Sequence, residues 1–159
     1  MRPRLDAFDF ALLDLMQRDN QLTSEQLAQA VALSPASCLR RVRRLRAAGV
    51  ISADVSLIDP SLVGQRLSSL ILVSLEREDP QRLAAFRESI ATHPEVTQCY
   101  YVTGEADFVL MVTVADMSEY ERFVARVLTA DANVRTFQSL MVMSKVKFET
   151  RVPLPAVPD

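Results

Sequence analysis

The stretch SPASCLRRVRRLRAAGV, residues 34–50, decides the fold of the N-terminal part of the chain. Ser34 is a good helix cap, and Pro35 suits the first helical position because its φ is fixed and it has no N–H to pair. Gly49 is typical of the position just after a helix. The stretch therefore predicts a helix from Pro35 to about Ala48.

This predicted helix has an apolar face and a cationic face. At about 100° per residue, one arc holds Cys38, Val42 and Leu45 and is expected to face a core. The opposite side holds Ser37, Arg40, Arg41 and Arg44, with Arg43 to one side and Arg46 near the apolar border. No Asp or Glu occurs between Gln26 and Ala53, so the arginines have no i,i+4 acidic partner. This favours contacts with phosphate and guanine over a merely solvated surface, which is the alternative interpretation.

Two helices are predicted before this one. Asp6 caps the first, which should end near Arg18 to Asn20. Thr23 opens the second through a capping box with Gln26. Two helices joined by a tight turn, preceded by a third, are typical of a helix-turn-helix, and double-stranded DNA is the predicted partner.

The docking mode of this motif assigns a role to each exposed residue. The N-terminal part of the recognition helix meets base edges, which selects Ala36, Ser37, Arg40 and Arg41. The residues predicted to contact phosphates are Arg43 and Arg44, and Ser34 is predicted to anchor the DNA backbone at the helix N-terminus.

The composition of the whole chain is that of a soluble globular protein. It has 159 residues, 49% hydrophobic and 24% charged, and no apolar run approaches the roughly 18 residues of a membrane span. No signal peptide is apparent, so cytoplasmic residence and no membrane partner are expected. Cys38 and Cys99 are isolated and are expected to be buried, with no metal site and no cofactor. Residues 1–52 carry a net +3 and residues 53–159 a net −5, which predicts that the smaller part meets a polyanion.

The rest of the chain predicts a second domain. GVISADVSLI, residues 49–58, reads as one or two short strands, and DPSLVGQ, residues 59–65, as a linker by its Pro, Gly and Asp, so residues 53–66 are expected to be strand and linker. Residues 67–150 show strand, helix and strand twice, the last strand reaching Phe148, in the order of a ferredoxin-like βαββαβ domain. Residues 151–159 form a Pro-rich tail, extended or disordered. The fold class is therefore α+β, with a helix-turn-helix domain at residues 1–52.

Two helices cover only one face of the predicted sheet. The other face carries Leu70 and Leu72, and such an apolar face predicts a second copy of the chain as its partner. A homodimer would also hold two recognition helices about one DNA turn apart, which suits a palindrome.

The sequence resembles the Lrp/AsnC, or feast/famine, family of transcriptional regulators over nearly its whole length. LSPASCLRRVRRLRAAGVI, residues 33–51, is similar to the family's LSPxxCxxRVRRLxxxGxI signature, and VTGEADFVLMV, residues 102–112, to its VxGxxDYxL turn. MSEYERFV, residues 117–124, and LMVMSKVK, residues 140–147, also fit the family pattern.

The resemblance implies that the helix-turn-helix of residues 1–52 is a winged one. It also implies a regulator whose DNA binding responds to a small effector, an amino acid, and which assembles as dimers and larger rings. By position it implies that Gly104 and Asp107, with Thr103 beside them and Ser139 on the last strand, bind the effector. The alternative for Gly104 and Asp107 is a plain hairpin turn.

Two other functions compete with this one. An architectural DNA-binding protein would keep the arginines without responding to an effector. The other is an enzyme, since sirohaem decarboxylases resemble this two-domain architecture. The one histidine, His93, precedes Pro94 at a predicted helix end, and no nucleophile with a base is apparent. No catalytic residues are therefore predicted.

Overall fold

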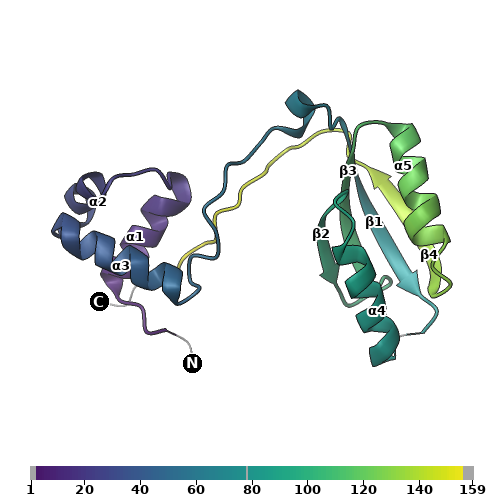
Figure 1. Cartoon of the computed structure of the whole chain (residues 1–159), viewed down its shortest axis with the longest axis horizontal. Helices are drawn as coiled ribbons and strands as arrows, with labels where there is room; N and C mark the ends of the chain where they lie inside the picture. Colours follow the sequence, from purple (N-terminus) through teal and green to yellow (C-terminus); the bar gives the residue numbers. More distant parts are fainter. Residues whose placement is uncertain (1–2, 78, 156–159) are drawn as a thin grey trace. The chain divides into compact units, whose positions relative to one another are not determined.

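The computed structural model describes residues 3–77 and 79–155 as two compact units (Figure 1). The N-terminal unit comprises the described chain up to Leu57 together with the C-terminal segment from Lys147, and the second unit, called the effector unit after the expectation from sequence, runs from Ile58 to Val146. These limits differ from the boundaries expected from sequence, which placed residues 147–150 in the second domain. The difference arises because Val152 is hydrogen-bonded to Gln17 of the first helix, which attaches the segment around Val152 to the N-terminal unit.

The N-terminal unit has the three predicted helices: α1 (Ala7–Arg18), α2 (Ser24–Val31) and α3 (Pro35–Ala47). The predicted caps are confirmed, since the side chains of Asp6, Thr23 and Ser34 each accept a backbone N–H of the first turn. The predicted apolar arc of α3 is also confirmed, because Cys38, Val42 and Leu45 are buried.

No strand forms in residues 49–58, so the one or two short strands expected there are absent from this described segment. Val55 and Leu57 are instead mostly exposed. A strand is stabilised by the backbone hydrogen bonds of a neighbouring strand, and among the described residues only β1 to β4 form such a sheet, so residues 49–58 gain no such bonds from it.

The effector unit has the predicted βαββαβ order. Its elements are a short 3₁₀ turn (Pro60–Val63), β1 (Leu67–Leu75), α4 (Pro80–Ala91), β2 (Val96–Tyr101), β3 (Phe108–Val114), α5 (Met117–Phe123), a π-helical turn (Val124–Thr129) and β4 (Val134–Met141). The sheet is antiparallel in the order β2-β3-β1-β4. The expected last strand reaching Phe148 is wrong, because β4 pairs with β1, and that pairing ends at Ser69 and Met141.

Both helices pack on one face of this sheet (Figure 1). Under them lie alternate residues of β1 and β3, among them Ile71, Val73, Phe108 and Leu110. The opposite face is apolar and only partly covered, and it includes Leu70, Leu72, Val109, Met111 and the exposed Leu140.

The two cysteines differ in their environments. Cys38 is buried as expected, but the prediction for Cys99 is wrong, since Cys99 is exposed. The reason is that β2 lies at the edge of the sheet and has a strand on one side only.

Candidate nucleic-acid interface and effector site

The start of α3 is ordered by its own cap. The Ser34 hydroxyl accepts the N–H of Ser37 at 3.2 Å, and Pro35 occupies the first turn. Ala36 and Arg40, one turn apart on this helix, are both exposed. The predicted base-reading end is therefore accessible at these two residues.

Arg41 is not on that accessible face, and the helical projection was wrong for it. Its side chain is only 23% exposed and turns toward α1. One guanidinium nitrogen donates to both carboxylate oxygens of Asp6, at 2.9 and 2.8 Å, and to Asp9 at 2.9 Å. The guanidinium also lies 5.4 Å from the ring centroid of Phe8. Arg41 therefore fastens α3 to the N-terminus of α1.

Asp9 is the centre of this contact. Its side chain is fully buried, and it accepts hydrogen bonds from Arg41, from Arg44 and from the N–H of Asp6. Burial by itself would raise the pKa of the Asp9 carboxyl, but the hydrogen bonds from Arg44, Asp6 and Arg41 outweigh it and lower the pKa. Contact with Asp6 and Asp9 correspondingly raises the pKa of Arg41. The carboxylate is thus ionised throughout the physiological range.

The arginines of α3 therefore fall into two groups. The paired group consists of Arg41, Arg44 and Arg46, the last bonded to Asp54 at 2.9 Å. Arg40 and Arg43 are exposed and have no acidic partner in the described part of the chain. No acid lies within one helical turn of these arginines, as expected, and the acids that pair with them, at positions 6, 9 and 54, lie outside residues 26–53.

Acidification is expected to weaken the N-terminal unit through Asp9. Because the pKa of Asp9 is lower in the folded than in the unfolded protein, its ion pairs contribute fully above the ordinary value near 3.8. That contribution is lost as the pH falls through the folded-state pKa. Denaturant unfolding between pH 7 and pH 2 should show this loss as a fall in the free energy of unfolding. Asp9→Asn should remove much of this pH dependence. The same pH dependence in the variant would show that Asp9 is not its source.

The predicted effector residues lie mostly in the turn between β2 and β3. The Asp107 carboxylate accepts the N–H of Leu75 at 2.6 Å, and the Asp107 N–H donates to the carbonyl of Val73 at 2.9 Å. Gly104 has φ of +129°, a region that favours glycine. Gly104 and Asp107 therefore stabilise the turn between β2 and β3, which is the role that the alternative interpretation gave them.

A hollow of about 240 Å³ lies beside this turn. It is lined by Leu72, Ser74, Glu105, Ala106, Thr136, Phe137 and Gln138. None of the predicted residues Thr103, Gly104, Asp107 and Ser139 lines it. Ser139 belongs to the helix-covered side, where its hydroxyl accepts a hydrogen bond from the buried Tyr120. Sequence reasoning missed Thr136 and Gln138 because the register of β4 against β1 is not visible in the sequence.

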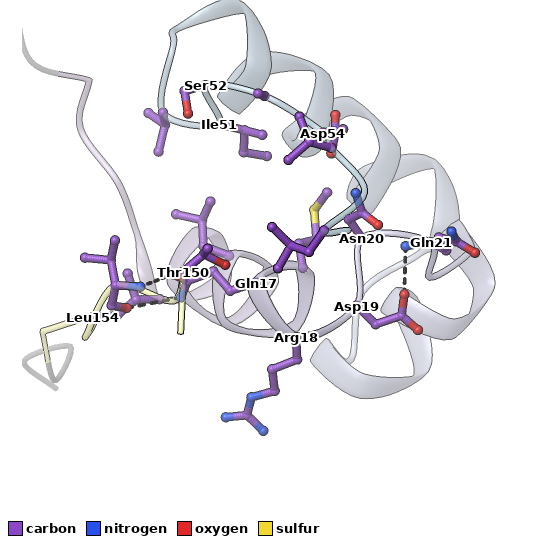
Figure 2. Close-up of a pocket in the computed structure, with 17 residues that line it drawn as sticks. Gln17, Arg18, Asp19, Asn20, Gln21, Ile51, Ser52, Asp54, Thr150 and Leu154 are labelled. Atoms are coloured by element: carbon purple, nitrogen blue, oxygen red, sulfur yellow. Dashed lines mark hydrogen bonds between the residues drawn. The ribbon is translucent and has the colours of Figure 1, made fainter. Parts of the chain in front are cut away.

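A larger hollow of about 630 Å³ lies within the N-terminal unit (Figure 2). It is bounded by the end of α1, by residues 50–55 and Leu57, and by Thr150, Val152 and Leu154 of the C-terminal segment. No motif in the sequence pointed to it.

Comparison with known proteins identifies the class to which this architecture belongs. Residues 5–52 match the model of a winged helix-turn-helix DNA-binding domain, and residues 68–152 match the Lrp/AsnC ligand binding domain. The chain is thus a two-domain transcriptional regulator with one DNA-binding and one ligand-binding domain. It belongs to the Lrp/AsnC family, and the resemblance noted in the sequence is confirmed.

Individual relatives agree with this membership. The chain is 47% identical to an uncharacterized HTH-type transcriptional regulator of Sinorhizobium fredii, over 94% of this chain and 89% of that protein. It is 34% identical to the leucine-responsive regulatory protein of Rhizobium meliloti, over 97% of this chain and 99% of that one. A Neisseria meningitidis transcriptional regulator solved with L-Met superposes with a TM-score of 0.88 at 34% identity, covering 94% of this chain and 97% of that one. Within residues 3–77 and 79–155 the helices are all too short or too polar to cross a membrane.

Proposed function

We propose that the exposed side of α3 reads DNA mainly through Arg40 and Arg43. The observation that carries this proposal is the division of the arginines, because Arg40 and Arg43 are accessible while Arg41 is held by Asp6 and Asp9. A guanidinium that is not already neutralised can bind phosphate or guanine without first losing a partner.

The position along α3 separates the roles. Ala36, Ser37 and Arg40 lie toward the N-terminal end, the part of a recognition helix that meets base edges. Arg43 lies further along and suits a phosphate, and Ser34 anchors the backbone at the helix N-terminus. Arg41 positions the helix instead of reading bases. Arg44 pairs with Asp9 but remains 53% exposed, so it combines positioning with access to a phosphate.

We propose that the effector unit binds an amino acid at the β2–β3 turn and the hollow beside it. Two relatives support the chemistry: one is named as leucine-responsive, and another was solved with L-Met. At this site, Glu105 and Asp107 offer carboxylates to an ammonium group, and the turn around Thr103 and Gly104 offers backbone N–H groups to a carboxylate. We omit Ser139 because its hydroxyl is engaged by Tyr120.

We propose further that two copies of the chain associate through the open sheet face. This face presents an apolar surface whose contact with water is unfavourable, formed by Leu70, Leu72, Val109, Met111 and Leu140. A two-fold pair presents two α3 helices to one duplex, and larger assemblies can then form from dimers. The proposed setting is the cytoplasm, and the proposed role is regulation without catalysis.

Selection of bound duplexes tests this function. The purified chain is mixed with random duplexes at two salt concentrations, without ligand and with each of the twenty amino acids. We expect a short palindromic consensus whose occupancy shifts with at least one amino acid. Binding without a consensus or a ligand response would instead indicate an architectural protein, and no binding at low salt would refute the proposal.

A further inference from the structure

One side chain of α1 forms two hydrogen bonds with the backbone of Val152, in the C-terminal segment. The Gln17 amide nitrogen donates to the carbonyl of Val152 at 3.2 Å, and the Gln17 amide oxygen accepts the N–H of Val152 at 2.6 Å. Both backbone polar groups of Val152 are thereby satisfied, as they would be by a neighbouring strand. Residues 150–154, here called the latch, are fixed to the DNA-binding unit at this point.

The latch is attached by little else. The Val152 side chain is mostly exposed, and Arg151 and Pro153 are exposed too, so only Leu154 is partly buried. Beside the latch lies the hollow of about 630 Å³, so this part of the unit is not tightly packed. The core of the N-terminal unit, which includes Leu12 and Cys38, does not include any latch residue. The latch can therefore detach without unfolding the helices.

The helix that holds the latch also holds the recognition helix. Gln17 lies on α1 eight residues after Asp9, and Asp9 bonds both Arg41 and Arg44 of α3. Because a helix of this length is a stiff element, a change in how the latch holds the end of α1 alters the support of α3 at the other end.

The effector unit is joined to the latch by the chain itself. β4 supplies Thr136, Phe137 and Gln138 to the hollow beside the β2–β3 turn, and nine residues after Met141 the same chain enters the latch. An effector that binds more tightly to one arrangement of β4 would bias whether the latch is seated.

We propose that residues 150–154 are a detachable latch through which the effector unit acts on the recognition helix, with Gln17 as its positioning residue. The effector-dependent part rests on the proposed amino-acid response of this chain. The seated latch supports the arrangement of α1 and α3 that binds DNA.

Gln17→Ala in the full-length chain tests the latch. We expect the Val152 amide to exchange about tenfold faster and the affinity for the selected duplex to fall about three- to tenfold. The change in Kd produced by the responsive amino acid should shrink toward none, while calorimetry should still detect binding of that amino acid, with a Kd changed by no more than the factor lost from the DNA response. Gln17→Glu keeps the acceptor for the Val152 N–H and should be intermediate. Gln81→Ala, at an exposed position of α4, is the control.

Removal of residues 151–159 completes the test. Gln17→Ala should have no further effect on DNA affinity in the shortened chain, because the group that it clasps is gone. If Gln17→Ala lowered DNA affinity equally in the full-length and the shortened chain, Gln17 would act within α1 alone and the latch would be refuted. Unchanged exchange of the Val152 amide, or unchanged DNA affinity, in full-length Gln17→Ala would also refute it. Should no amino acid shift DNA binding of the wild-type chain, the proposed effector response fails, and amide exchange and basal affinity still decide the latch.

Discussion

Asp9→Ala is expected to destabilise the N-terminal unit by about 3 kcal/mol, the low end of what is lost when one partner of a buried ion pair is removed. Asp9 is fully buried, and it bonds two arginines of α3 and the N–H of Asp6. The loss of stability should lie at the low end because the guanidinium of Arg44 is half exposed and can be solvated by water once Asp9 is removed. The melting temperature should fall by more than about 10 °C.

Denaturant unfolding, with hydrogen exchange of the α1 and α3 amides, measures this loss. Asp14→Ala is the matched control, since Asp14 lies on the same helix and pairs with Arg18 at the surface. Exposed pairs of this kind contribute at most about 1 kcal/mol. If Asp9→Ala cost no more than Asp14→Ala, the buried contact would not be what fastens α3 to α1.

Arg40→Ala is expected to weaken binding to the preferred duplex by about 10- to 100-fold, which corresponds to the roughly 1–3 kcal/mol of one base contact. Preference at one base pair of each half-site should relax. Protein stability should stay the same, because Arg40 is exposed and has no bonded partner among the residues that the structure describes.

A panel of duplexes with single base changes, read by fluorescence anisotropy, checks this prediction. Arg82→Ala, an exposed arginine of α4, removes the same charge from the other unit and should leave the preference intact. A uniform loss of affinity across all duplexes would place Arg40 at a phosphate instead of a base.

The sequence was sufficient for the helix-turn-helix because its signals are local. Caps such as Asp6 and Ser34 satisfy N–H groups three residues away, and the structure shows these bonds as expected. The βαββαβ order was likewise predictable from the alternation of strands and helices. Strand ends were not, since they depend on the length of the neighbouring strand, as for β4.

The candidate sites were predictable only in part, because their chemistry depends on tertiary contacts. Nothing near Arg41 in the sequence shows that Asp6 and Asp9 neutralise it. In the effector unit, the turn around Gly104 was visible in the sequence, but the hollow is completed by Thr136 and Gln138 of another strand. The clasp of Val152 by Gln17 joins residues 135 positions apart and has no local signal.

The most direct test of the central claim is the salt dependence of DNA binding for Arg40→Ala, Arg43→Ala and Arg41→Ala, each measured where the variant is folded. We predict that the slope of log K against log salt flattens by up to about one unit for Arg43→Ala and changes little for Arg41→Ala, with Arg40→Ala altering sequence preference most. A slope that flattened for Arg41→Ala as much as for Arg43→Ala, with no change in preference for Arg40→Ala, would contradict the division of the α3 arginines into positioning and DNA-reading groups.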